Sequence, residues 1–159
     1  VTSLAEDILR YEPDADALSY RRALYLMTNR SDKSGFRFLF DAADPDNVGD
    51  QRTVSTVAAQ SLFLMNHPFV LQLLPPMASA ASRGLNPASS DAALAARLSQ
   101  LYLSLFAREP TPQEQRLGIA LLRRAVATAA PAQRQQAWHH AWQQYCQVLL
   151  CTNELIYLN

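Results

Sequence analysis

The apolar run at residues 52–70, RTVSTVAAQSLFLMNHPFV, constrains the fold more than any other stretch of the chain. From Val57 onwards its apolar side chains recur at helical spacing, and Leu62 and Phe63 widen the stripe almost to the full circumference. A helix that is apolar nearly all round is normally buried. We therefore expect a buried helix here, around which the other elements pack.

The limits of this helix follow from the residues that flank it. Hydroxyl groups such as that of Ser55 can accept hydrogen bonds from the free amides of a first helical turn. Pro68 disfavours helical geometry at His67, so a break or kink is expected there. Pro75 and Pro76 then interrupt the apolar run again. No segment reaches the ~20 unbroken apolar residues that a membrane span requires, so we expect none.

The second half of the chain carries clearer helix signals. After a helix tail and linker at residues 78–90, Ser90 or Asp91 begins an amphipathic helix that ends before Pro110. Its apolar face consists of leucines at spacings of three and four: Leu94, Leu98, Leu101 and Leu105. Thr111 and Glu114 then form a capping box that begins the next helix. The connection is so short that the two helices should form a helical hairpin. We expect the second helix to bury one further set, flanked by Leu122 and Val126: Leu117, Leu121 and Ala125.

Pro131 opens a last long helix that runs to about Thr152. It presents large apolar side chains at spacings of four, three and four: Trp138, Trp142, Tyr145 and Leu149. The two tryptophans are expected to anchor the core, although a ligand platform is the alternative. Val148 broadens the stripe, and the tail at residues 153–159 is expected to dock back on the domain.

These patterns predict an all-α fold. Only four glycines and abundant Ala, Leu, Arg and Gln favour helix, and 159 residues favour one domain. Signals before residue 41 are weaker: a capping box starts a short helix at Ser3, and residues 17–28 fit a helix or, around residues 24–26, a strand. We expect a single compact helical domain over residues 1–159, with about five to six helices. It should end in a helical hairpin plus a long C-terminal helix.

Charge and cysteine content exclude several classes of protein. With 14 basic and 14 acidic residues the net charge is zero, which disfavours nucleic-acid binding. Cys146 and Cys151 lie five residues apart, about 7.5 Å along a helix axis, which is too far for an undistorted disulfide. Two cysteines are also too few for a structural zinc site. We interpret them as buried apolar residues, with a redox pair as the alternative.

Familiar catalytic and metal-binding patterns are not met. His139 and His140 are adjacent, and His67 is distant, so no pair has the spacing of a metal-binding helix face. The acidic loop at residues 41–50 begins like a calcium loop, but Ser55 stands where a twelfth-position carboxylate is needed. Turn formation is favoured there, and calcium binding stays open. We predict no catalytic, cofactor-binding or metal-ligating residue, and no cofactor.

One cluster of polar residues remains as a candidate site. It combines three arginines that lie beside apolar residues with two aspartates of the acidic loop: Arg21, Arg22, Arg52, Asp41 and Asp44. Pairing of the arginines with Asp41, Asp44 or Glu109 inside the fold is the structural interpretation. Anion binding on an exposed face is the functional one.

Several short motifs follow one another in a familiar order, at residues 21–25, 40–45, 52–56, 60–70, 101–111 and 146–157. The series resembles the planctomycete PSD-type domain of unknown function over roughly residues 20–158. The resemblance implies the C-terminal end of a large exported, extracytoplasmic protein, often behind cytochrome-c-like modules, and no established reaction. Since Val1 is not an initiator methionine, a fragment or a processed product is expected. No haem-attachment motif occurs in this sequence.

Two functions are consistent with the sequence. The favoured one is a non-catalytic helical module that interacts with, or is a scaffold for, upstream domains of the same protein or a protein partner. Every strong signal in the chain is packing or capping, which favours it over an enzyme. The alternative is part of a hydrolytic or polysaccharide-processing enzyme that uses Asp41, Asp44 and the nearby arginines. Carboxylates can perform acid–base chemistry there only if their pKa values are shifted apart.

Overall fold

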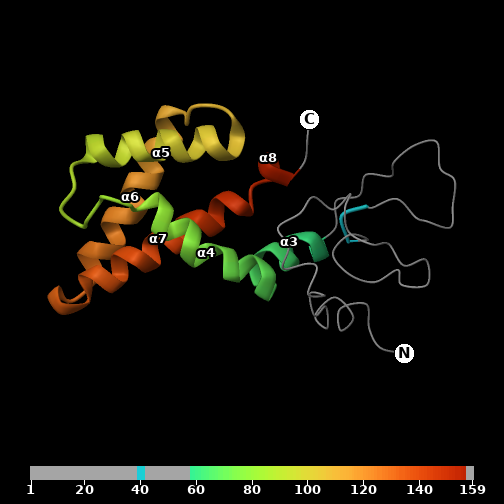
Figure 1. The fold of residues 1–159 in the computed structure, drawn as a ribbon, viewed down its shortest axis with the longest axis horizontal. Coiled ribbons are helices and arrows are strands. Elements are labelled where there is room, and N and C mark those ends of the chain that lie inside the picture. Colours follow the sequence, from blue (N-terminus) through green and yellow to red (C-terminus); the bar gives the residue numbers. More distant parts are fainter. Residues whose placement is uncertain (1–38, 42–57, 157–159) are drawn as a thin grey trace, which may run out of the picture. The chain divides into compact units, whose positions relative to one another are not determined.

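The computed structural model describes residues 39–41 and 58–156. In these residues it contains α-helices, one 3-10 helix and no strand, which confirms the all-α prediction (Figure 1). In chain order the helices are α3 (Ala58–Asn66), α4 (Pro68–Ala81), α5 (Asp91–Phe106), α6 (Pro112–Thr128), the 3-10 helix η2 (Pro131–Gln133), α7 (Arg134–Leu150) and α8 (Asn153–Ile156).

The chain divides into two compact units, Val1–Phe69 and Val70–Asn159. We describe each by itself, and the expected single domain stays a prediction. No helix in the described ranges combines the length and the apolar character that crossing a membrane requires.

In the first unit, α3 buries one narrow face. Gln60 and Phe63 are its buried residues, and the side-chain amide of Gln60 donates a 2.8 Å hydrogen bond to the carbonyl of Leu39. The ring of Phe63 meets Phe40 edge to face at 5.8 Å and stacks on His67 at 4.2 Å. Positions 60, 63 and 67 follow helical spacing, so the buried face comes from a narrow stripe.

The prediction that α3 is buried all round is wrong. Leu62 is 57% exposed and Met65 is 45% exposed. A run in which most positions are apolar contains no information about which face turns inward, and this helix has only nine residues. The capping residues expected before it lie outside the described residues.

Proline acts differently at its two places in this region. The predicted break at His67 is confirmed, since α3 ends at Asn66 and α4 begins with Pro68 as its first residue. The predicted interruption at Pro75 and Pro76 is wrong, because α4 continues through both. Both prolines are exposed, whereas Leu74 and Ala78 beside them are buried. Burial of the other face holds the helix together although each proline removes a backbone donor.

The core of the second unit is formed where α4, α5, α6 and α7 meet. Its largest fully buried side chains come from the last three of these helices: Leu94, Leu98, Leu122, Trp138, Trp142 and Cys146. Trp138 and Trp142 meet edge to face at 5.7 Å. The prediction that these tryptophans are buried is confirmed, as it is for Tyr145 and Leu149.

Gly118 allows α6 to approach its neighbours closely. A Cβ atom at this position would lie 2.8 Å from the hydroxyl oxygen of Tyr145 and 2.9 Å from Cδ1 of Leu98. Real Cβ atoms do not come this close to other atoms, so α5, α6 and α7 can meet here only because position 118 carries no side chain. The predicted α5–α6 hairpin is confirmed by the contacts between these two helices.

Of the predicted inner residues of α6, Leu121 and Ala125 pack against the core and are partly buried, whereas the prediction for Leu117 is wrong. Leu117 is 62% exposed, while Gly118 and Leu122 are the buried positions. A search for large apolar residues passes over a glycine, although its lack of a side chain is what allows burial here. Val148 of α7 is likewise 54% exposed instead of broadening the core face.

Candidate functional site

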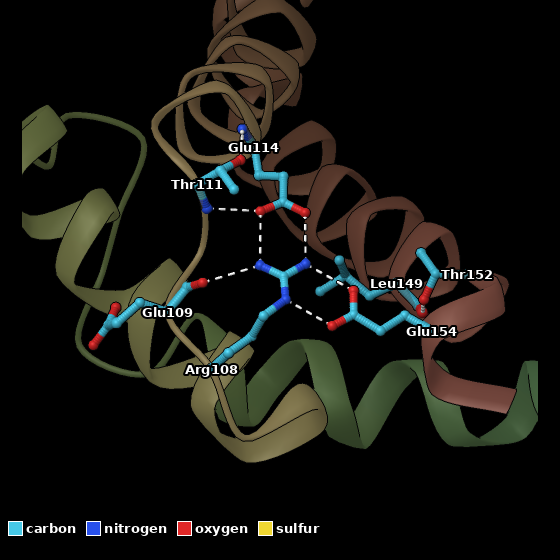
Figure 2. A network of polar contacts seen from close by, with 7 residues as sticks. All are labelled: Arg108, Glu109, Thr111, Glu114, Leu149, Thr152 and Glu154. Atoms are coloured by element: carbon cyan, nitrogen blue, oxygen red, sulfur yellow. Dashed lines mark hydrogen bonds and ion pairs between the residues drawn. The ribbon is translucent and has the colours of Figure 1, made fainter. Parts of the chain in front are cut away.

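The most connected polar group in the described residues is Arg108, which follows the end of α5 (Figure 2). Ala107 closes α5 in the left-handed conformation, with φ 55°, and its N–H donates to the carbonyl of Leu103. The chain then turns, and Arg108 meets the start of α6 and the short helix α8. We call Arg108, Glu114 and Glu154 the Arg108 cluster.

Glu114 binds one edge of the Arg108 guanidinium. Nη1 donates to Oε2 at 2.9 Å and Nη2 donates to Oε1 at 2.8 Å. Oε2 also accepts from the backbone N–H of Thr111 at 2.7 Å, while the Thr111 hydroxyl accepts from the backbone N–H of Glu114. This is the predicted capping box, which the structure confirms. Hydrogen bonds from Arg108, more than those from Thr111, lower the pKa of Glu114 to about 2.

Glu154 binds a second edge of the same guanidinium. Nε donates to Oε1 at 2.6 Å and Nη2 donates to Oε2 at 2.7 Å. The hydrogen bonds from Arg108 lower the pKa of the Glu154 carboxyl. Glu154 belongs to α8, which contacts α5, so the predicted docking of the tail is confirmed as far as Ile156.

Two aromatic rings support the guanidinium. Its Cζ lies 5.3 Å from the ring centre of Tyr102 and 5.8 Å from that of Phe106. Both rings belong to the last turns of α5, so cation–π attraction adds to the hydrogen bonds in orienting Arg108. Burial raises the pKa of the Tyr102 hydroxyl and, more strongly, that of Tyr145 behind it.

The five hydrogen bonds of Arg108 use all five of its N–H groups, since Nη1 also donates to the carbonyl of Glu109 at 3.0 Å. In this state the guanidinium has no donor left for a substrate. The pKa values of Glu114 and Glu154 are both lowered, so neither carboxyl holds a proton near neutral pH to act as a general acid. The cluster joins α5, α6 and α8.

Two further arginines, Arg123 and Arg97, also use their side chains for contacts within the chain. Arg123 pairs with Asp91 at 2.7 Å and donates to the carbonyls of Pro87 and Ser89. Arg97 donates to the carbonyl of Arg83 at 2.8 Å. Both arginines hold the connection between α4 and α5 against the helices that flank it.

Metal-ligating residues do not gather within residues 39–41 and 58–156, where no three His, Cys, Asp or Glu side chains are grouped. Cys146 and Cys151 are free, and burial raises the pKa of both thiols, that of Cys146 to about 11. His139 lies 3.2 Å from Gln135 on the surface of α7. Nδ1 of His67 accepts a hydrogen bond from the N–H of Phe69 at 3.2 Å.

The sequence-predicted polar cluster lies almost wholly outside the described residues. This applies to Arg21, Arg22, Asp44 and Arg52, and also to most of the acidic loop. Asp41 is described: it is partly exposed and has a φ of 54°, in the left-handed region that aspartate tolerates better than most residues. The cluster therefore stays a prediction, and calcium binding by the acidic loop stays open.

Sequence reasoning missed the Arg108 cluster. It recognised Thr111 and Glu114 as a helix start, but it treated Arg108 only as a helix end. It also named Glu109 as a possible ion-pair partner for other arginines, whereas Glu109 binds Arg108 through its backbone carbonyl. No local pattern connects Arg108 with Glu154, which lies 46 residues further along the chain. Only the closing of the chain brings them together.

A family model described as PSD1, a protein of unknown function (DUF1553), matches residues 4–122. The matched region includes Arg108 and Glu114 and ends inside α6, so Glu154 lies beyond it. No curated protein and no solved structure matches the chain.

Proposed function

Since the chain belongs to the PSD1 (DUF1553) family of proteins of unknown function, we propose from its own residues that it is a non-catalytic helical interaction or scaffold module. Its role is to hold upstream domains of the same protein, or a separate protein partner, in place. It is part of an exported multidomain protein and works outside the cytoplasm.

The observation that supports this proposal most is the use of the arginines. A catalytic arginine needs free N–H groups directed at its substrate. All five N–H groups of Arg108 are bound within the chain, and Arg97 and Arg123 donate to backbone carbonyls beside them. These side chains stabilise helix ends, which is what a scaffold requires.

The exported location and the multidomain setting depend on the family resemblance of the sequence. The domain that this chain resembles occurs at the C-terminal end of large extracytoplasmic proteins, often behind cytochrome-c-like modules. The partner that follows from this setting is a domain that precedes Val1 in a longer chain.

Association with such a domain is the direct test. We expect the purified chain to bind the separately purified upstream portion of its parent protein, with a defined stoichiometry in isothermal titration calorimetry. An absence of binding at the highest attainable concentrations would contradict the proposal.

A second assay addresses the enzymatic alternative. We expect no turnover of a panel of ester, phosphoester and glycoside substrates by the purified chain. Asp41→Asn is the matched variant, because it removes the one carboxylate of the predicted polar cluster that the structure describes. Turnover that this variant reduces would replace the scaffold proposal with the hydrolytic one.

A further inference from the structure

We propose that Arg108 forms a carboxylate-binding site for a partner protein, and that Glu154 of α8 is an exchangeable internal ligand of this site. The ligand is an acidic side chain on a partner segment, followed by aliphatic residues. The inference rests on the proposed interaction function and names the chemistry that the partner presents.

The two carboxylates of the Arg108 cluster are held very differently. Glu114 lies in the first turn of the 17-residue helix α6, and the capping box with Thr111 fixes it in addition to Arg108. Its side chain is 31% exposed. Removing Glu114 from Arg108 would therefore also disturb the capping box at the start of α6.

Glu154 has no comparable support. Within the described residues its side chain is hydrogen-bonded to Arg108 alone, and it is 45% exposed. It belongs to α8, which has four residues and no buried one. A helix of this length is not stable by itself, so α8 keeps its place through contacts with α5. Of the two carboxylates, Glu154 is the one that can leave without disturbing a long helix.

The vacated site would keep its shape. Glu114 and the Glu109 carbonyl still accept three of the five N–H groups of Arg108. The rings of Tyr102 and Phe106 still lie against the guanidinium. Nε and one N–H of Nη2 are then free along one edge, in the planar fork that binds a carboxylate through two parallel hydrogen bonds.

The composition of α8 indicates what the partner segment looks like. Glu154 is followed by Leu155 and Ile156, both of which are partly buried. A partner segment with a carboxylate followed by two aliphatic residues can make the same contacts. It must compete with an internal ligand whose effective concentration is of the order of millimolar. The partner segment therefore binds weakly while Glu154 is paired with Arg108, and more tightly once the Glu154 carboxylate is removed.

A peptide supplied in trans tests this directly. The probe is an acetylated, amidated peptide with the sequence of residues 152–156, TNELI, titrated into the full chain. We expect Glu154→Ala to bind it about tenfold or more tightly than the unaltered chain does, because the internal carboxylate that competes for Arg108 is gone. The matched control is Glu109→Ala, which removes an exposed carboxylate that makes no ion pair with Arg108. It should bind the peptide as weakly as the unaltered chain.

Two further measurements locate the binding. A peptide with glutamine in place of glutamate should lose most of its affinity, because a neutral amide has only one acceptor oxygen and cannot form the charged, two-bond pair with the guanidinium. The ¹⁵N resonance of Arg108 Nε in the Glu154→Ala chain should shift on titration with the acidic peptide only. The proposal would be overturned if the unaltered chain, Glu154→Ala and Glu109→Ala bound the peptide equally well. It would also be overturned if the glutamate and glutamine peptides had equal affinity. Neither comparison requires an Arg108 variant to fold.

The outcome can be separated from that of the proposed function. If Glu154→Ala binds the upstream domains no better than the unaltered chain does, and also ignores the peptide, the interaction function stands and this site is wrong. If the peptide binds as expected but no upstream domain does, the carboxylate site stands and the scaffold role is wrong.

Discussion

Arg108 and Gly118 show how single residues decide this structure for opposite reasons. Arg108 acts through what it carries, since its five N–H groups bind acceptors from α6, from α8 and from the connection between α5 and α6. Gly118 acts through what it lacks, since any side chain would meet Tyr145 and Leu98. Both positions are therefore sensitive to conservative substitutions.

Replacing Gly118 with alanine should destabilise the protein. Overpacking costs roughly 1–3 kcal/mol, and the better helix propensity of alanine offsets at most about 1 kcal/mol of it. The free energy of unfolding in urea measures the difference. Adding Tyr145→Phe removes the nearest obstructing atom and should restore part of the loss. If Gly118→Ala is as stable as the unaltered chain, the close approach of α6 to its neighbours is wrong.

The Glu114 carboxylate should make stability depend on pH in the acidic range. Its pKa is about 2 in the folded protein and near 4.5 when it is free, so its contribution is complete above about pH 4.5. The contribution is lost as the pH falls towards 2. Glu114→Gln keeps the shape of the side chain but does not titrate. Urea unfolding at pH 6, 4 and 2.5 should show the advantage of the unaltered chain over this variant shrinking as the pH falls, and a constant difference would contradict it.

At the scale of elements, helix ends carry most of the specific polar contacts. Ser90 caps α5, Thr111 and Glu114 cap α6, and Arg123 binds the connection that precedes α5. Because these contacts are at the ends, they decide where each helix starts and how the chain turns between helices. They leave the helix faces to be sorted by burial alone.

Removal of the Thr111 cap should cost more than the loss of an ordinary surface hydroxyl. Thr111→Ala leaves an amide of α6 without its acceptor and is expected to destabilise by about 1 kcal/mol. Thr128→Ala is the matched control at the other end of α6. There the hydroxyl donates to carbonyls of its own helix, those of Arg124 and Ala125, and caps no free amide. Midpoints of thermal unfolding compare the two, and equal midpoints would argue against the capping box.

At the scale of the whole molecule, the core of Val70–Asn159 depends on which side of each helix faces inward. Leu122 of α6 is fully buried among α5 and α7 residues, whereas Leu117, five residues earlier, is 62% exposed. The two leucines are chemically identical and share a helix. Their difference comes only from the direction in which each side chain points.

Alanine substitutions at these two leucines test the placement of the core. Leu122→Ala should destabilise by about 2–5 kcal/mol, because it leaves a cavity in packed surroundings. Leu117→Ala should change stability by no more than about 0.5 kcal/mol. Chemical denaturation measures both. A larger loss of stability for Leu117→Ala than for Leu122→Ala would contradict this placement of the core and would support the sequence prediction that Leu117 faces inward.

The sequence by itself determined the all-α class, the break at His67, the start of α6 at its capping box and the burial of Trp138 and Trp142. These features depend on local stereochemistry or on strong helical periodicity, which a short window contains. Only the tertiary structure decided that Leu62, Met65 and Leu117 are exposed, that α4 passes through Pro75 and Pro76, and that Arg108 binds Glu154. Each of these depends on which surfaces meet when distant segments come together, and no local pattern encodes that.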